Sequence, residues 1–323
     1  MSEVAPGLVT VFGGSGFVGS QVVQALARRG WRVRVAVRNP KRAWKLQTAG
    51  NVGQIQSFRC DATQPEQVAE ALVGAEAAVN LIGILYESGR RTFHTMHVET
   101  ARNIAEACAA GRVDRLVHMS AIGASPDSES DYALSKAAAE MSVREVKPDA
   151  VIIRPSVVFG PGDDFLNRFA QMAQYAPALP LIGGGQTKFQ PVYVGDVAEA
   201  VARAATLAEA AGRTFELGGP AVMTFEDVLK LVLRETYRDN GLVPLPFFAA
   251  RAIGSMAQLS AAVGIAPLLT RDQVILLESD NVVADGAEGL AELGIEPTGV
   301  EAIAPGYLWR YRRGGQFAEP KAA

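Results

Sequence analysis

The sequence is poor in cysteine, in net charge and in long apolar runs, and each shortage argues against a class of protein. Cys60 and Cys108 are the only cysteines. They lack metal-ligand spacing and lie among apolar residues, so we expect reduced, buried thiols and an intracellular protein. A formal net charge of −3 gives no electrostatic basis for binding nucleic acid. No run of roughly 18 apolar residues occurs, which predicts no membrane-spanning helix, and the opening MSEVAPG lacks the pattern of a signal peptide.

A glycine-rich turn near the N-terminus is the strongest signal in the chain. Residues 8–12 (LVTVF) predict a short buried strand, glycines follow at 13, 14, 16 and 19, and a helical pattern starts at once. Glycines let the backbone approach a pyrophosphate, and the helix start favours its negative charge. Two registers fit, because Gly14, Gly16 and Gly19 form G-x-G-x-x-G while Gly13, Gly16 and Gly19 form G-x-x-G-x-x-G. In this context the turn predicts a nucleotide-binding site; the plainer alternative is a turn that only packs a helix against a strand.

Basic residues follow the second predicted strand, residues 31–38. In NAD-binding Rossmann units an acidic residue about 20 positions after the glycines holds the ribose 2′-hydroxyl. Here that position is Arg38, with Lys41 and Arg42 close behind. A carboxylate would repel a 2′-phosphate, whereas a guanidinium binds it in fork geometry. The spacing therefore predicts NADP(H) over NAD(H), and the plainer alternative is a solvated basic loop.

The first half of the chain alternates strands with helices. After residues 8–12 and 31–38, further strands are predicted at about 54–58, up to Asn80–Gly83, up to Ser120, and from residue 149 onward. No tight hairpins separate them, which predicts an α/β fold with a doubly wound parallel sheet. We expect residues 1–160 to form an NADP(H)-binding Rossmann domain to which residues about 186–217 return. Residues 161–323 are expected to form a smaller C-terminal α/β lobe that faces a substrate or partner.

One pair of residues has the spacing of a proton-transfer site. Tyr132 and Lys136 lie four positions apart in a predicted helix and so share a face. A lysine ammonium beside a phenol favours phenolate, and such a pair could exchange a proton with a carbinol oxygen while nicotinamide carries the hydride. Ser120, at the end of the fifth strand, could add a hydroxyl donor, with Ala121 as the alternative occupant of that position. His94 and His97 lack a carboxylate or cysteine to complete a ligand set, so we predict no metal site.

The motifs GGSGFVG, CDAT, NLIG, YALSK and RPSVVFGPGD together resemble the short-chain dehydrogenase/reductase superfamily, of the extended and atypical kind, over most of residues 8–220. The resemblance implies that Asp61 contacts adenine, that Lys136 also binds the nicotinamide ribose and that Pro155 lies near the nicotinamide amide. From turn and resemblance together we expect cofactor contacts at Gly13, Ser15, Gly16, Phe17, Val18, Gly19, Arg38, Lys41, Asp61, Ala62, Leu81, Ile82, Gly83, Ser120, Tyr132, Lys136, Pro155 and Val158.

A narrower resemblance covers nearly the whole chain. The segments NLIG, DFLNRFAQM, KFQPVYVGDVAEA, PLPFFAAR, LLTRDQV and LAELGIEP are similar to the Rossmann-type accessory subunits of respiratory complex I and their bacterial relatives. This resemblance implies a protein that holds NADP(H) as a structural cofactor at the peripheral arm of complex I. It implies a cytoplasmic protein, peripheral on the cytoplasmic face of the inner membrane.

The apolar segment 243–269 and the overall function each leave alternatives open. The segment predicts either a core helix pair or a surface helix that meets a membrane or a partner. For the function we expect a structural NADP(H) carrier in complex I. The alternatives are an active oxidoreductase, epimerase or dehydratase that uses Tyr132 and Lys136, and a regulator that senses the nucleotide's redox state.

Overall fold

The computed structural model describes residues 6–262, 267 and 269–318. These residues divide into two compact units. Unit 1 comprises residues 1–155, 195–217 and 285–296, and unit 2 comprises residues 156–194, 218–284 and 297–323. The chain therefore leaves the first unit after its sixth strand and returns to it twice.

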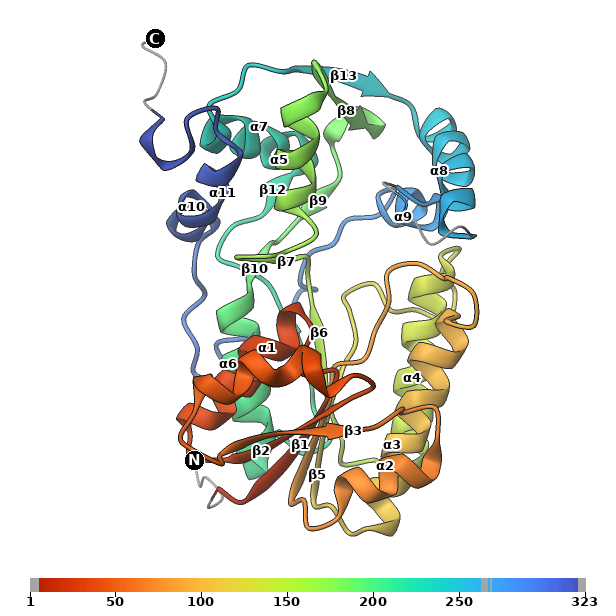
Figure 1. Cartoon of the computed structure of the whole chain (residues 1–323). Helices are drawn as coiled ribbons and strands as arrows, with labels where there is room; N and C mark the ends of the chain where they lie inside the picture. Colours follow the sequence, from red (N-terminus) through yellow and green to blue (C-terminus); the bar gives the residue numbers. More distant parts are fainter. Residues whose placement is uncertain (1–5, 263–266, 268, 319–323) are drawn as a thin grey trace. The chain divides into compact units, whose positions relative to one another are not determined.

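Unit 1 is built on a seven-stranded parallel sheet (Figure 1). The strand order is β11-β6-β5-β4-β1-β2-β3, in which the sequence order reverses between β1 and β4. This is the doubly wound arrangement that the alternating pattern predicts, and ligands bind in such folds at the carboxyl ends of the strands beside the reversal. The strands are β1 (Leu8–Phe12), β2 (Arg32–Val37), β3 (Ile55–Arg59), β4 (Ala77–Asn80), β5 (Arg115–Met119), β6 (Val151–Pro155) and β11 (Thr214–Leu217).

Helices cover both faces of this sheet (Figure 1). On one face α2, α3 and α4 bury a continuous apolar core that includes Val68, Ile104 and Val143 against Leu116 and Ile152 of the strands. The other face carries α1 and α6. The helical elements of unit 1 are α1 (Phe17–Arg28), the 3-10 helix η1 (Pro40–Ala49), α2 (Pro65–Leu72), the π-helix η2 (His94–Glu99), α3 (Thr100–Ala110), α4 (Asp131–Val146), α6 (Val194–Thr206) and η4 (Ala208–Ala210).

Unit 2 has short strands packed around a helical core. Three two-stranded sheets pair β10 with β7, β12 with β9 and β13 with β8. Helix α7 begins at a capping box in which Thr224 and Asp227 exchange hydrogen bonds of 3.0 and 3.1 Å. The elements of unit 2 are β7 (Val158–Phe159), α5 (Leu166–Tyr175), β8 (Ala178–Ile182), η3 (Gly183–Gly185), β9 (Lys188–Phe189), β10 (Val192–Tyr193), β12 (Met223–Thr224), α7 (Phe225–Thr236), β13 (Gly241–Leu245), α8 (Phe247–Ala262), α9 (Arg271–Leu276), α10 (Val300–Ile303), α11 (Pro305–Leu308), η5 (Trp309–Tyr311) and η6 (Gly315–Phe317).

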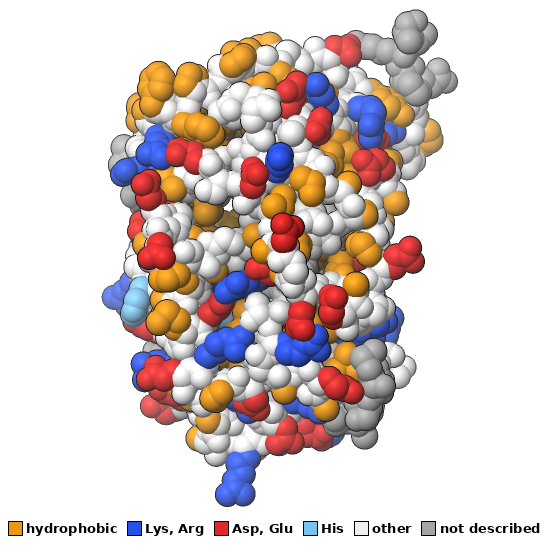
Figure 2. Space-filling view, turned by 180° about the vertical axis from the view of Figure 1, so that it is seen from behind, with side chains coloured by type: hydrophobic (Ala, Val, Ile, Leu, Met, Phe, Trp, Pro, Cys, Tyr) orange, Lys and Arg blue, Asp and Glu red, His pale blue; other side chains and the backbone are white. Residues whose placement is uncertain are grey.

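The apolar segment 243–269 forms the end of β13 and the helix α8. Phe247 and Ala250 pack into the core of unit 2, whereas Phe248 and Met256 are 78% and 75% exposed. Helix α8 therefore has one packed side and one exposed apolar side, and residues 263–266 and 268 lie outside the described part. None of the described helices is long and apolar enough to cross a membrane. On the face shown in Figure 2, acidic and basic side chains are interspersed and form no large patch of one sign.

Candidate dinucleotide-binding site

The glycine turn joins β1 to α1 with a geometry that larger residues do not fit. Gly13 has a φ of +78°, and a Cβ there would lie 3.1 Å from the backbone of Leu81. A Cβ on Gly19 would lie 2.3 Å from the carbonyl oxygen of Gly13. No described side chain caps the start of α1 at Gly16. The first N–H groups of this helix are therefore available to an anion.

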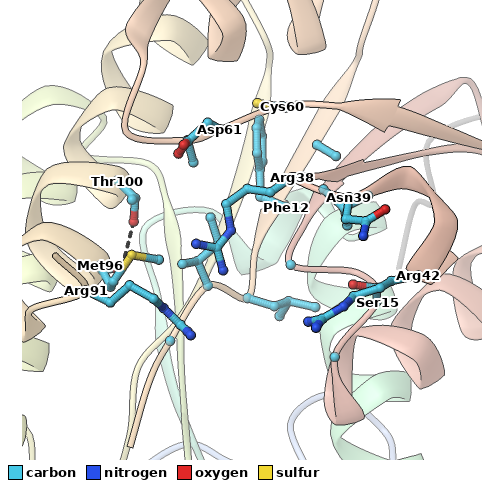
Figure 3. A pocket seen from close by; sticks show the side chains of 18 residues that line it. Phe12, Ser15, Arg38, Asn39, Arg42, Cys60, Asp61, Arg91, Met96 and Thr100 are labelled. Carbon is cyan, nitrogen blue, oxygen red and sulfur yellow. Dashed lines mark hydrogen bonds between the residues drawn. The ribbon is translucent and has the colours of Figure 1, made fainter. Parts of the chain in front are cut away.

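A cavity of about 550 Å³ opens beside this turn (Figure 3). Its lining comes from the carboxyl ends of four neighbouring strands and from the segments that follow them. Nine of the residues expected at the cofactor line it: Gly13, Ser15, Gly16, Arg38, Asp61, Ala62, Leu81, Ile82 and Gly83. Gly13 rather than Gly14 faces the cavity, because a Cβ on Gly14 would meet Val35 and Val23 of the core.

The other expected residues lie elsewhere. Phe17, Val18 and Gly19 form the first turn of α1, next to the lining residue Gly16. Lys41 is exposed in η1 and its backbone N–H donates to the Asn39 side chain at 3.1 Å. Pro155 ends β6, and Val158 begins β7 in unit 2. Ser120, Tyr132 and Lys136 form a separate group described below.

Several lining residues were not assigned to the site from sequence. They are Phe12, Ala36, Val37, Asn39, Arg42, Cys60, Arg91, Met96 and Thr100. The sequence could have indicated Arg42 as a lining residue, because it lies four positions beyond Arg38 in the helical segment η1. No sequence pattern indicated Arg91, because it reaches the cavity from a loop more than fifty residues away along the chain.

Three arginines give the cavity its charge. Arg38 follows β2, Arg42 lies in η1 and Arg91 lies in the loop before η2, and Figure 3 shows the side chains of Arg38 and Arg91 directed into the same space. Burial lowers the pKa of Arg91, and the charge of Arg38 lowers it further. Asp61 is the carboxylate of the lining, and its Oδ1 accepts hydrogen bonds from the backbone and side chain of Thr63 at 3.2 and 2.9 Å.

Lys136 is a buried cation on α4. Its side chain is almost fully enclosed, and its Nζ donates to the carbonyl oxygen of Met119 at 3.1 Å. Burial lowers its pKa to about 8, although the nearby Glu140 opposes the shift. The Lys136 Nζ lies 5.9 Å from the centre of the Tyr132 ring. The sequence spacing therefore does bring the ammonium next to the tyrosine.

The hydroxyl of Ser120 is also buried. Its backbone N–H donates to Ile153 at 2.7 Å, and its Oγ has no hydrogen-bond partner among the described residues. A buried hydroxyl without a partner costs free energy, so this oxygen is available to a further polar group.

A buried histidine connects α4 to the segment that lines the cavity. His97 Nε2 accepts the backbone N–H of Ile84 at 3.0 Å, so its proton lies on Nδ1 and is directed at Ser135 Oγ, 2.8 Å away. Ser135 in turn donates to the carbonyl oxygen of Tyr132 at 2.7 Å. Burial, and then the charge of Lys136, lowers the pKa of His97 to about 2. The imidazole is therefore a neutral structural link.

A second buried pair orders the end of β4. Asn80 Oδ1 accepts the backbone N–H of Ile82 at 3.0 Å, and its Nδ2 lies 3.1 Å from His118 Nδ1. Burial lowers the pKa of His118 to about 3, so this ring is neutral as well. Together Asn80 and His97 fix residues 82 and 84 on either side of Gly83. These links were not predicted, since no sequence pattern pairs residues so far apart.

The arrangement fits a phosphate-bearing dinucleotide. Gly13 and Gly16 line the cavity with bare backbone, and the free helix start and the arginines complement the charge of a phosphate. Asp61 and Ala62 would hold the adenosine half, and Gly83 and Lys136 would lie toward the nicotinamide. A bound nicotinamide would supply hydride transfer.

The parallel sheet, the glycine turn and this cavity define a Rossmann-type dinucleotide-binding protein. A match to the NAD dependent epimerase/dehydratase family extends over residues 9–218. The chain belongs to this family, whose members form part of the short-chain dehydrogenase/reductase group that the motifs resemble.

Individual relatives cover more of the chain. The mitochondrial NADH dehydrogenase [ubiquinone] 1 alpha subcomplex subunit 9 of Rattus norvegicus is 36% identical over 313 residues, which are 96% of this chain and 82% of that protein. Ceramide reductase of Caulobacter vibrioides is 32% identical over 56% of each chain. Among solved structures, UDP-glucose 4-epimerase of Thermus thermophilus in complex with NAD is 25% identical, with a TM-score of 0.58 over 74% of this chain and 86% of that one.

Proposed function

We propose that this protein is an NADP(H)-binding accessory subunit of a respiratory NADH:ubiquinone oxidoreductase, complex I, and that the nucleotide is a structural cofactor. The observation that carries the proposal is the extent of the similarity to the rat subunit, 96% of this chain. A shared nucleotide site alone would account for similarity over unit 1. Similarity that continues through unit 2 supports a shared role in assembly.

The choice of NADP(H) rests on the residues after β2. Arg38 and Arg42 line the cavity there, and no carboxylate follows β2 to accept a ribose 2′-hydroxyl. A guanidinium pair is suited to a 2′-phosphate, which carries nearly two negative charges.

A structural role is supported by how the residues of the expected catalytic group are held. Lys136 is enclosed and bonded to Met119, and Ser120 is buried at the end of β5. Ala121, the alternative occupant of the position expected to hold a catalytic hydroxyl, has none. The exposed apolar side of α8, with Phe248 and Met256, is the proposed contact with the cytoplasmic face of the inner membrane.

Two measurements test the proposal. The purified full chain is denatured, and the released nucleotide is identified and compared before and after long dialysis; we expect NADP(H), retained at close to one per chain. Release of NAD(H) on denaturation would refute the choice of cofactor, and rapid loss of any nucleotide on dialysis would refute the structural role.

In the second measurement a tagged chain is recovered from native membranes in mild detergent. We expect complex I subunits to co-purify, and their absence, with the tag alone as control, would refute the assembly.

An active oxidoreductase is the second candidate, and the position of Lys136 favours it. Its ammonium lies near the Tyr132 ring and has a pKa lowered toward neutrality, as proton-transfer sites require. The similarity to ceramide reductase over part of the chain points the same way. This candidate predicts exchangeable NADP(H) and a carbonyl substrate that Tyr132→Phe no longer turns over although it still binds NADPH. Equal turnover by the variant and the wild type would exclude it.

A further inference from the structure

The loop between β4 and η2, residues 84–92, has a fixed shape. Its start is held by the hydrogen bond from Ile84 to His97, and Glu87 accepts the backbone N–H of Phe93 at 2.6 Å near its end. Between them Ser88 and Arg91 exchange backbone hydrogen bonds of 3.1 and 3.0 Å around Gly89, which has a φ of +57°. Internal hydrogen bonds of this kind determine the direction in which each side chain of the loop leaves the backbone.

This fixed loop directs one of its two arginines into the cavity. Arg91 lines it, together with Met96 and Arg38 (Figure 3), whereas the neighbouring Arg90 is not among the lining residues, although both arginines are exposed. Adjacent residues of one turn thus have different surroundings. Arg90 therefore offers a matched control of the same charge.

The three guanidiniums share the cavity with one lining carboxylate, Asp61, which accepts hydrogen bonds from Thr63. Arg38, Arg42 and Arg91 make no ion pair with any residue in the described part of the chain, so the lining carries more positive than negative charge. Like charges that converge in a partly enclosed space repel one another, and an anion placed between them relieves the repulsion. NADP(H) offers two anionic sites, the pyrophosphate and the 2′-phosphate, and NAD(H) has the pyrophosphate alone.

We propose that Arg91 is a third phosphate ligand of the dinucleotide, which reaches it from the loop after β4 while Arg38 and Arg42 reach it from the segment after β2. This inference rests on the proposed function only in that the cavity binds NADP(H). It assigns to residues 84–92 the role of closing one side of the phosphate site. The cofactor is then held by ligands from two segments that are far apart in the sequence.

The test compares Arg91→Gln with Arg90→Gln in the full chain depleted of nucleotide. Binding of NADPH and of NADH is measured by titration calorimetry. We expect Arg91→Gln to weaken NADPH binding about tenfold, because a charge-assisted hydrogen bond is lost, and Arg90→Gln to change it less than about twofold. If NADPH alone weakens, Arg91 binds the 2′-phosphate; if NADPH and NADH weaken alike, it binds the pyrophosphate.

A melting measurement separates ligation from a merely structural role. Without nucleotide, Arg91→Gln is expected to melt at or above the wild-type temperature, because one of the repelling cations is gone; with saturating NADPH it is expected to gain less than the wild type does. Equal affinities for Arg91→Gln and Arg90→Gln would overturn the inference and leave the proposed function intact. A wild type that binds NADH as tightly as NADPH would refute the choice of NADP(H), while the comparison of the two variants would still test Arg91.

Discussion

Two regions of unit 1 treat their polar groups in opposite ways. The phosphate region, Gly13, Gly16, Arg38, Arg42 and Arg91, presents a free helix start and cations that form no ion pair within the described residues. In the tyrosine region, Tyr132, Ser135, Lys136 and His97, the ammonium and the imidazole already have protein partners, although the Oγ of Ser120 has none among the described residues. The first region is suited to gaining stability from a ligand. The second contributes to the stability of the protein itself. This contrast favours a structural nucleotide that stays bound over one that is oxidised or reduced in a catalytic cycle.

The largest effect is expected from a methyl group in the phosphate region. Gly19→Ala would place a Cβ 2.3 Å from the carbonyl oxygen of Gly13. Relief requires that α1 and the turn separate, so we expect a loss of about 3 kcal/mol in the free energy of unfolding and loss of nucleotide binding. Urea denaturation measures the first and calorimetry the second. Gly306→Ala is the control, since nothing lies within 4 Å of that Cβ; equal effects of the two would contradict the packing argument.

In the tyrosine region, Lys136→Met tests the energetic effect of the buried cation. Burial lowers the pKa of Lys136 from 10.5 to about 8, so between these values the unfolded chain binds more protons than the folded one. The stability of the wild type relative to the variant therefore rises as the pH rises from about 8 to about 10.5, by about 3 kcal/mol in total. Denaturation of both proteins at a series of pH values checks this. A difference between them that stays constant with pH would show that the ammonium is not desolvated.

A smaller loss is expected from His97→Leu. The change leaves the backbone N–H of Ile84 without its acceptor and removes a donor to Ser135, which together cost about 2 kcal/mol. His94→Leu serves as control because His94 is exposed and pairs only with Glu99 among the described residues; we expect a change within about 0.5 kcal/mol. Thermal melts of both variants provide the comparison. Similar losses in the two variants would mean that the hydrogen bonds between residue 84 and α4 add nothing to the free energy of unfolding.

The smallest effect on stability accompanies the sharpest change in specificity. Arg38→Asp replaces a cation of the phosphate region by a carboxylate, which repels a 2′-phosphate and can accept a ribose 2′-hydroxyl. We expect the preference for NADPH over NADH to fall by about tenfold or more with little change in melting temperature. Lys41→Gln, outside the described lining, is expected to leave the preference unchanged. Competition binding of the two nucleotides provides the ratio, and an unaltered ratio in Arg38→Asp would remove Arg38 from the 2′-phosphate site.

Patterns in the sequence predicted the strands and helices whose conformation is determined by residues close together in the chain. The strand Leu8–Phe12 has the bounds that the sequence indicates, and Tyr132 and Lys136 lie in one helix, Asp131–Val146, as their spacing predicts, because these patterns are encoded within each segment. The sequence also indicated Arg38, since its distance from the glycine turn is fixed by one βα unit. The roles assigned to the individual site residues stay predictions.

What the sequence could not indicate depends on contacts between distant segments. The π-helix His94–Glu99 is one such feature, and its wider turn is accompanied by the bonds of His97 to Ile84 and Ser135. Arg91 lines the cavity because a loop folds back on itself, and the two-residue strands of unit 2 are too short to carry a pattern. Each of these features is determined by tertiary packing rather than by local propensity.

The return of the chain to unit 1 has a consequence for biosynthesis. Strand β11, at the edge of the parallel sheet, pairs with β6 but is separated from it by nearly sixty residues, and residues 285–296 complete the unit still later. While the ribosome makes the intervening segments, β6 has a free edge that can pair with another nascent chain. The edge of β6 therefore stays unpaired until β11 has been made, when about two thirds of the chain has been translated. A truncated chain that ends before β11 would keep this edge of β6 unpaired.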